Sequence, residues 1–350
     1  MKRGLLITLL IIGLLCAGWF AELLWSAGQF KNIESHFKGT CSPVVGITGP
    51  EDIVIHPETG VAYISACDRR AVSLGRPGKG GIFAYDLNLA GAKPVNLTPT
   101  ADPDFQPHGI SLYTGLSGQS ILFVINHQGG EHTIEIYALQ SGQLFHQKTL
   151  ADPALVSPND LVAVGPDQFY VTNDHRYPSG IKRTLEDYLK LPLSNVLFYT
   201  GSKFVEAASD IGYANGINVS ADGRLLYVSA TVRGELHVYD RNISTHTISL
   251  KEKLNLRTGL DNIELDQNGR LYIAAHPKLL TFVKHAKNSA VLSPSQILRL
   301  EARPAGGYDL EEIYLNTGEE ISGSSVGAVH NNRMLIGTVF DPKILDCQLE

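Results

Sequence analysis

The amino-acid sequence predicts an all-β fold, a six-bladed β-propeller, and three observations lead to that prediction. Pairs of apolar strands joined by polar turns recur along the chain, beginning near positions 51, 108, 159, 215, 261 and 324. Their spacing of roughly 50 residues, with several strands to each repeat, is typical of propeller blades. Most pairs open with polar side chains, and the first residues of a propeller's inner strands meet at one mouth of the central tunnel.

The clearest repeat spans residues 261–275. A strand over 261–265 runs into the turn Asp266-Gln267-Asn268-Gly269, and a second strand follows over 271–275. Asn and Gly accept the positive φ that tight hairpin turns require. The remaining strand pairs, of which the last is the weakest, are 51–55 with 61–65, 108–112 with 121–125, 159–163 with 168–172, 215–219 with 225–229, and 324–328 with 333–337.

The bulk composition fits one large folded domain. The 350 residues are 43% hydrophobic, and the net charge of −6 comes without a basic cluster, which argues against a nucleic-acid partner. We therefore expect a catalytic propeller over residues 29–350, preceded by a separate segment over 1–28. Residues 21–40 are expected to form an amphipathic or irregular stalk, and residues 181–190 the one short helix within the body.

The N-terminal segment is a candidate membrane anchor. Lys2 and Arg3 precede an apolar run over residues 4–20, which reaches the lower limit for spanning a bilayer. Positive charge before the run favours a cytoplasmic N-terminus and export of the rest of the chain to the periplasm or extracellular space. A cleaved signal peptide is the alternative, although no good cleavage site follows.

The cysteines agree with export. Cys41 and Cys347 bracket the predicted propeller, and a disulfide between them would clasp the two ends of a circular fold. Two unrelated reduced thiols are the alternative. Cys67, just past an apolar strand, is expected to be a free thiol.

The polar residues that open the strand pairs form a candidate ion site. Carboxylate and amide oxygens without Cys or paired His suit calcium rather than zinc. The candidate ligands of a first ion are Glu51, Asn159, Asn215, Asp261 and Asn262. Asp52 and Asp160, with a backbone carbonyl near Ile110, would hold a second ion deeper in the tunnel. The alternative is that these residues only cap turns, but their recurrence in phase with the repeat favours ion binding.

Two histidines stand where they could act on water. His108 opens the second strand pair, and His127 follows its partner strand. An imidazole beside a divalent cation can take a proton from water, while the cation polarises an ester or lactone carbonyl. Each histidine could instead be a structural hydrogen-bonding residue. The Gly323–Gly327 segment fits the Gly-x-Ser-x-Gly pattern, but a nucleophile at Ser325 is disfavoured because a strand, not a helix, is expected after it.

At these residues the sequence resembles the paraoxonase/arylesterase family over almost its full length. The similar segments are Gly49–Asp52, Pro107–Ser111, Val124–His127, Asn159–Pro166, Phe169–His175, Ala214–Asn218, Leu260–Ile263, His276-Pro277 and Leu335–Phe340. The substrate-side loops over 66–81 and 176–193 depart from the family's pattern.

The resemblance implies a six-bladed propeller with two calcium ions, one catalytic and one structural, that hydrolyses lactones and aryl esters. It implies the same two ligand sets, with the carbonyl of Ile110 in the second. His108 would be the general base with His127 as relay partner, and Asp261 is an alternative base. A Cys41–Cys347 disulfide and a retained N-terminal anchor are also implied.

The sequence thus predicts a calcium-dependent lactonase/arylesterase acting on a small-molecule lactone or ester. The alternatives are a gluconolactonase-like or strictosidine-synthase-like propeller with another substrate class, and a calcium-stabilised propeller without catalysis. No feature of the sequence indicates an oligomeric state.

Overall fold

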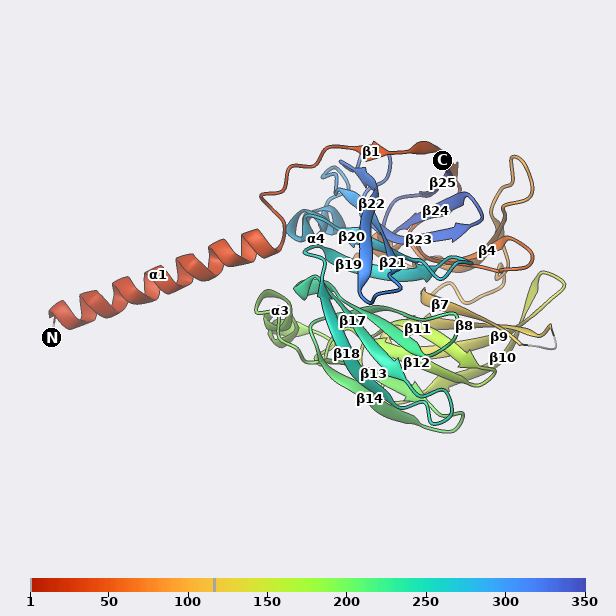
Figure 1. Cartoon of the computed structure of the whole chain (residues 1–350), viewed down its shortest axis with the longest axis horizontal. Helices are drawn as coiled ribbons and strands as arrows, with labels where there is room; N and C mark the ends of the chain where they lie inside the picture. The colour runs from red at the N-terminus through yellow and green to blue at the C-terminus, as the bar shows by residue number, and fades with distance from the viewer. Residues whose placement is uncertain (1, 116–117) are drawn as a thin grey trace.

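A computed structural model of the chain describes residues 2–115 and 118–350, and these form a β-propeller with a helix projecting from one side (Figure 1). Six antiparallel sheets make up this described part of the chain. The inner strands pack against one another in ring order, each opening a new blade. The predicted six-bladed fold is therefore confirmed.

The first three blades each contain four consecutive strands, ordered from the tunnel outward. Blade 1 comprises β3 Pro50–Ile55, β4 Val61–Ala66, β5 Gly81–Asp86 and β6 Val95–Asn96. Blade 2 comprises β7 Pro107–Thr114, β8 Ser120–Asn126, β9 Thr133–Gln140 and β10 Gln143–Ala151. Blade 3 comprises β11 Pro158–Gly165, β12 Gln168–Asn173, β13 Ser194–Tyr199 and β14 Phe204–Ile211.

Blade 4 also contains four consecutive strands, β15 Ala214–Val219, β16 Leu225–Ala230, β17 Glu235–Arg241 and β18 Ile248–Asn255.

The last two blades also take strands from the N-terminal part of the chain. Blade 5 comprises β19 Gly259–Leu265, β20 Leu271–His276, β21 Ser295–Ala302 and β22 Tyr308–Asn316, with β1 His36–Phe37 at its edge. Blade 6 comprises β23 Ser324–His330, β24 Arg333–Thr338 and β25 Lys343–Leu349, and β2 Gly39–Val45 completes it.

The hydrophobic core lies between the blades rather than at one centre. The described residues form six buried apolar clusters, each drawn mainly from two neighbouring blades. One of them joins Ile53 and Ile64 of blade 1 to Val326 and Leu335 of blade 6. Apolar packing on the blade faces leaves the strand ends free to carry polar residues into the tunnel.

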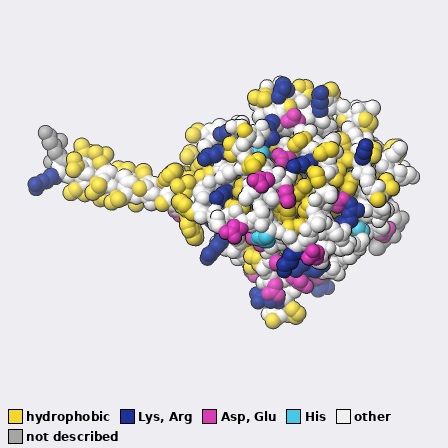
Figure 2. Space-filling model, turned by 90° about the horizontal axis from the view of Figure 1, so that it is seen from above, with side chains coloured by type: hydrophobic (Ala, Val, Ile, Leu, Met, Phe, Trp, Pro, Cys, Tyr) yellow, Lys and Arg dark blue, Asp and Glu magenta, His cyan; other side chains and the backbone are white. Residues whose placement is uncertain are grey.

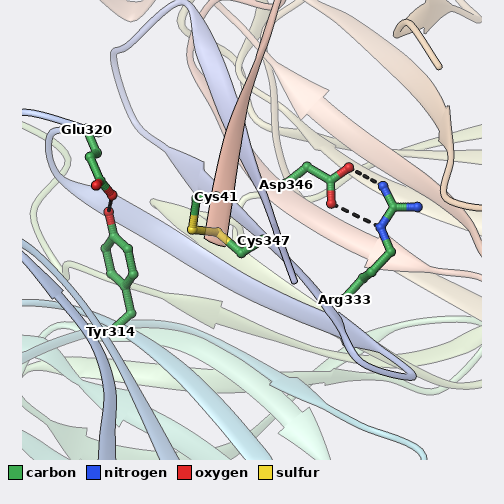
Figure 3. The surroundings of a disulfide bond; sticks show 6 residues. All are labelled: Cys41, Tyr314, Glu320, Arg333, Asp346 and Cys347. Carbon is green, nitrogen blue, oxygen red and sulfur yellow. Dashed lines mark hydrogen bonds and ion pairs between the residues drawn. A yellow bond between two sulfur atoms is a disulfide. The ribbon is translucent and has the colours of Figure 1, made fainter. Parts of the chain in front are cut away.

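A disulfide closes the ring where the two ends of the chain meet. Cys41 of β2 lies opposite Cys347 of β25, and their sulfur atoms are bonded across a separation of 306 residues. Figure 3 shows this bond near the ion pair of Arg333 with Asp346. The predicted pairing is confirmed, and Cys67 is a buried free thiol, as expected.

The helices differ in part from the sequence-based expectation. The expected body helix is present as α3 Gly180–Tyr188, but α4 Leu279–Lys287 and the short α2 Arg69–Ser73 are also helical, so the expectation of one body helix is wrong. The run Leu279-Leu280-Thr281-Phe282-Val283 has the apolar and β-branched composition of a strand. As a helix, the segment places Leu279, Phe282 and Val283 against the cavity.

The expected amphipathic or irregular stalk over 21–40 is only partly present: helix α1 Lys2–Ser26 runs into it and β1 and β2 join the blades, while residues 27–35 contain no helix or strand. Leu23 and Ala27 are buried at the end of α1, while its earlier apolar side chains are exposed. Figure 2 shows these hydrophobic side chains along the helix that projects from the body. Met1 lies outside the described residues.

Candidate active site

Each inner strand has the same irregularity at its first residues. The register shifts between Pro50 and Asp52 in β3, and corresponding shifts interrupt β7, β11, β15, β19 and β23 near their starts. A β-bulge adds a residue to one strand and turns its side chain in a new direction. Here the bulged residues include Glu51, Asn159 and Asn215, which therefore point into the tunnel mouth instead of following the strand's alternation.

Glycine allows the inner strands to come close enough for these residues to meet. A Cβ on Gly109 would lie 2.5 Å from the carbonyl oxygen of Asn159, and one on Gly216 would lie 2.5 Å from that of Asp261. Both distances are far below van der Waals contact. The His-Gly-Ile and Asn-Gly-Ile sequences thus bring the polar residue at the start of each of these inner strands next to the one at the start of the following blade's inner strand.

Four of the predicted ligands of the first ion, Glu51, Asn159, Asn215 and Asp261, line one cavity of about 640 Å³. The fifth, Asn262, lies beside them, since its amide donates to Glu51 Oε1 at 3.1 Å. The structure therefore brings the five residues together, although they come from four separate blades.

Four oxygen atoms of this cluster lack hydrogen-bond donors among the described residues. Glu51 Oε2 and the Oδ1 atoms of Asn159, Asn215 and Asn262 are all buried without a partner. Buried polar atoms are nearly always paired, and buried charges commonly coordinate metals. These residues fit a hard cation such as calcium, which takes oxygen ligands of mixed type. The described residues hold no group of three or more His, Cys, Asp and Glu placed for a metal ion, so amide oxygens would be essential to it.

The two carboxylates of the cluster differ in their surroundings. Burial opposes ionisation of Glu51, but His108 and Arg69 hold the pKa of its carboxyl below the ordinary value. Burial, with help from the charge of Glu51, raises the pKa of Asp261, while His276 opposes that rise. His276 Nε2 lies 2.9 Å from Asp261 Oδ2, and its ring stacks on Phe282.

Asp52 and Asp160, predicted for a second ion, lie beneath the cavity and do not line it. The amide of Ile110 donates to Asp52 Oδ2 at 2.7 Å, and the amide of Ile217 donates to Asp160 Oδ2 at 2.8 Å. Burial and the charge of Glu51 raise the pKa of Asp52 well above its ordinary value. Burial and Asp52 do the same for Asp160.

Sequence analysis missed a third carboxylate in this lower region. Burial and the charge of Asp52 raise the pKa of Glu264 well above its ordinary value. Glu264 follows the bulged residue Asn262 by two positions in β19, beyond the register shift. An acidic residue two positions after the predicted ligand Asn262 is a signal that the sequence already contains.

His108 connects the oxygen cluster to His127. Its Nε2 lies 3.5 Å from Glu51 Oε2, and its Nδ1 lies 2.8 Å from His127 Nε2. His108 lines the cavity, while His127 lies behind it. Burial and the positive charge that His108 can carry lower the pKa of His127 well below its ordinary value. The predicted histidine pair is therefore in contact.

Ser325 is part of strand β23 and is fully buried. Its hydroxyl donates to the backbone carbonyl of Glu51 at 2.6 Å. A strand and not a helix contains this serine, so the Gly-x-Ser-x-Gly match is no nucleophile elbow.

The mouth of the cavity is apolar, and the sequence did not indicate which residues line it. Leu279, Phe282 and Val283 of α4 line it, together with Tyr188 of α3 and Phe340. The buried end of α1 completes this wall. Such a lining favours ligands with apolar groups.

The fold and this cavity define a six-bladed propeller in which buried oxygen atoms lie beside an imidazole pair. Residues 32–349 match the Arylesterase family. The chain belongs to that family.

Curated relatives cover most of the chain. Human serum paraoxonase/arylesterase 1 is 34% identical over 322 residues, covering 88% of each chain. Rat serum paraoxonase/arylesterase 2 is 33% identical over 369 aligned residues, covering 100% of each.

Solved structures with the same fold are much more distant in sequence. A luciferin-regenerating enzyme aligns with a TM-score of 0.57 at 13% identity, covering 89% of this chain and 95% of that one. A gluconolactonase from Xanthomonas campestris gives 0.53 at 15%, covering 92% and 99%. The calcium-binding protein regucalcin from Agrobacterium tumefaciens gives 0.52 at 12%, covering 90% and 96%.

Proposed function

We propose that this protein hydrolyses lactones and aryl esters with the help of calcium bound in its tunnel. The observation that carries the proposal is the group of unpaired, buried oxygen atoms beside the His108 imidazole. Membership of the arylesterase family supports the same reaction, as do relatives named paraoxonase/arylesterase. An ester carbonyl entering the cavity meets both groups.

The residues that would hold the catalytic ion are Glu51, Asn159, Asn215, Asp261 and Asn262. The residues that would hold the second, structural ion are Asp52 and Asp160, together with the backbone carbonyl of Ile110. Calcium supplies a Lewis acid that polarises an ester carbonyl and favours negative charge on its oxygen.

The chain's own residues handle the proton. In this proposal His108 Nε2, which faces the cavity, takes a proton from the water that attacks the ester carbon. His127 accepts the proton of His108 Nδ1 across their 2.8 Å contact. Asp261 is a weaker candidate for the base, because its Oδ2 is already bonded to His276.

The cavity wall indicates the substrate class. Leu279, Leu280, Phe282 and Val283 present an apolar surface close to the polar tunnel mouth. A neutral ester with an apolar acyl or aryl group matches this division. A lactone carrying an alkyl chain would place its ring at the oxygen cluster and its chain against α4.

Helix α1 is proposed as a retained membrane anchor, with the propeller on the exported side. Its segment Arg3–Ser26 is long and apolar enough to cross a membrane, and its most apolar stretch of 18 residues has a mean hydropathy of 2.4 and no buried residue. An ion pair between Glu22 and Lys190 joins the end of α1 to the propeller beyond α3. The disulfide fits an oxidising compartment. We propose residues 1–28 as the anchor and 29–350 as the catalytic domain.

Hydrolysis of phenyl acetate and a panel of lactones, with and without a chelator, tests the proposed function. We expect chelator-sensitive turnover, and a His108→Gln variant that loses about 10²- to 10⁴-fold in kcat while remaining folded. His36→Gln, an exposed histidine at the edge of blade 5, is the matched control. Full activity of His108→Gln would refute the assignment, and turnover of sugar lactones alone would favour the gluconolactonase-like alternative.

A further inference from the structure

A third histidine continues the line that His108 and His127 begin. His132 Nδ1 lies 2.8 Å from His127 Nδ1, and the two rings meet edge to face with centroids 4.8 Å apart. The corresponding centroid distance between His108 and His127 is 5.1 Å. Three imidazoles therefore run in contact from the tunnel mouth toward the surface of blade 2.

The short turn between the two strands creates this contact. Residues Gln128–Gly130 form one turn of 3-10 helix, in which Gly129 and Gly130 have φ of 64° and 81°. Glycine adopts these angles without strain. The turn folds the chain back, so that His132, just before β9, faces His127 at the end of β8.

We propose that His132 is the third member of a proton relay, through which the proton removed from water leaves the active site for bulk solvent. The proposal rests on the proposed esterase function. Ester hydrolysis at neutral pH gives an alcohol, a carboxylate and one proton, and this proton must leave the cavity. His132 acts through His127, so it is a positioning and relay residue and does not touch the substrate.

The relay balances proton by proton. His108 Nε2 takes a proton from water as the water oxygen bonds to the ester carbon. His108 then passes its Nδ1 proton to His127 Nε2, and His127 passes its Nδ1 proton to His132 Nδ1. His132 releases its Nε2 proton to solvent. Each ring ends as the opposite neutral tautomer and returns to the first by exchange with solvent and ring reorientation.

The contacts among the three histidines also determine the tautomer of His108 that a base at Nε2 requires. A neutral imidazole has one donor and one acceptor nitrogen, so the two contacts of His127 must have opposite polarity. His108 can act as a base at Nε2 only if its proton is on Nδ1. Then His127 must accept at Nε2 and donate from Nδ1, and His132 Nδ1 is the acceptor. Without His132, no other hydrogen bond to His127 Nδ1 within the described residues supports that tautomer.

The surroundings of His127 favour its neutral form. Burial lowers its pKa most, and the positive charges of His108, His132 and Arg69 act in the same direction, opposed by Asp174. A neutral ring can accept one proton while it donates another.

His132 is also kept mainly neutral, but it is less enclosed. Burial lowers its pKa, as do Arg183 and His108, whereas Asp174 and Glu131 oppose the shift. Its ring is only partly buried, next to the exposed Gly130 and Glu131. This exposure gives the relayed proton a route to water.

Other histidines of the propeller have a different environment. His146 and His237 each contact a glutamate, Glu135 at 2.8 Å and Glu235 at 3.0 Å, as is common for structural histidines. Within the described residues His132 contacts no carboxylate, and its recorded hydrogen-bond partner is His127.

The test compares His132→Ala with His146→Ala, a control on β10 of the same blade. We expect His132→Ala to lose about tenfold or more in kcat with little change in KM, Tm or calcium affinity, since a relay loss is part of the acid–base contribution. Added imidazole should restore the rate of His132→Ala in proportion to its concentration, while a buffer without an imidazole should not. The control should retain wild-type kinetics.

A second measurement does not depend on turnover. In 15N spectra of the imidazole rings, wild-type His127 should carry its proton on Nδ1, and His132→Ala should show a mixture of tautomers. An unchanged kcat, a loss that imidazole does not restore, or an unchanged His127 tautomer would each overturn the relay while leaving the esterase proposal intact. A wild-type protein that hydrolyses no ester would overturn both.

Discussion

Removal of calcium should destabilise the propeller as well as inactivate it. Four buried oxygen atoms, Glu51 Oε2 and the Oδ1 atoms of Asn159, Asn215 and Asn262, have no hydrogen-bond partner within residues 2–115 and 118–350. Leaving one such atom unsatisfied costs about 1–3 kcal/mol, so the four together cost about 4–12 kcal/mol when no cation is bound. That loss is comparable with the whole stability of a typical domain, about 5–15 kcal/mol.

Calorimetry in the presence of a calcium-selective chelator measures this effect. At about 2 °C per kcal/mol, the lower estimate corresponds to a fall in Tm of about 8 °C or more, reversed by calcium but not by magnesium. Asn215→Ala should reduce the shift caused by the chelator. Asn218→Ala, on the same strand but with its amide already bonded to Ile263, should leave that shift unchanged. A change in Tm below about 2 °C on chelation would refute the reasoning.

Three further outcomes are expected. Replacing Cys41 and Cys347 by serine should lower the free energy of unfolding by about 2–5 kcal/mol in denaturant titrations, because the bond joins distant parts of the chain; Cys16→Ser should have no effect. Burial opposes protonation of His175, but its two carboxylate partners raise its pKa to about 9, so the folded state binds the extra proton between pH 6.5 and about 9. Stability should therefore fall as pH rises through that window, by at most about 3 kcal/mol, and His175→Gln should remove this dependence. Deletion of residues 2–20 should abolish binding to lipid vesicles and leave Tm unchanged; a lower Tm would show that this part of α1 supports the fold.

The repeat made the fold predictable from the sequence. Each blade contains a strand pair with a tight turn, and the polar openers recur in phase with these pairs. Their common position at the start of each strand pair was enough to group Glu51, Asn159, Asn215 and Asp261, although these residues are far apart in the sequence.

What the sequence did not reveal depends on contacts between distant segments. The bulges at the starts of the inner strands appear only once neighbouring blades pack together. His276 of β20 contacts Asp261 of the neighbouring strand β19. Helix α4 packs along the rim of the cavity, and its local sequence does not indicate a helix. His132 was missed because a five-residue interval from His127 matches neither helix nor strand periodicity.

The pairing of β2 with β25 has a consequence for biogenesis. Blade 6 takes its outer strand from the beginning of the chain and its other strands from the very end. The ring therefore stays open until β25 is available, and a chain lacking only that strand would expose the edge of β24 and leave β2 without its partner in blade 6. Under the anchoring by α1 that we propose, the propeller would be exported before β25 docks against β2. Folding and disulfide formation would then occur together on the far side.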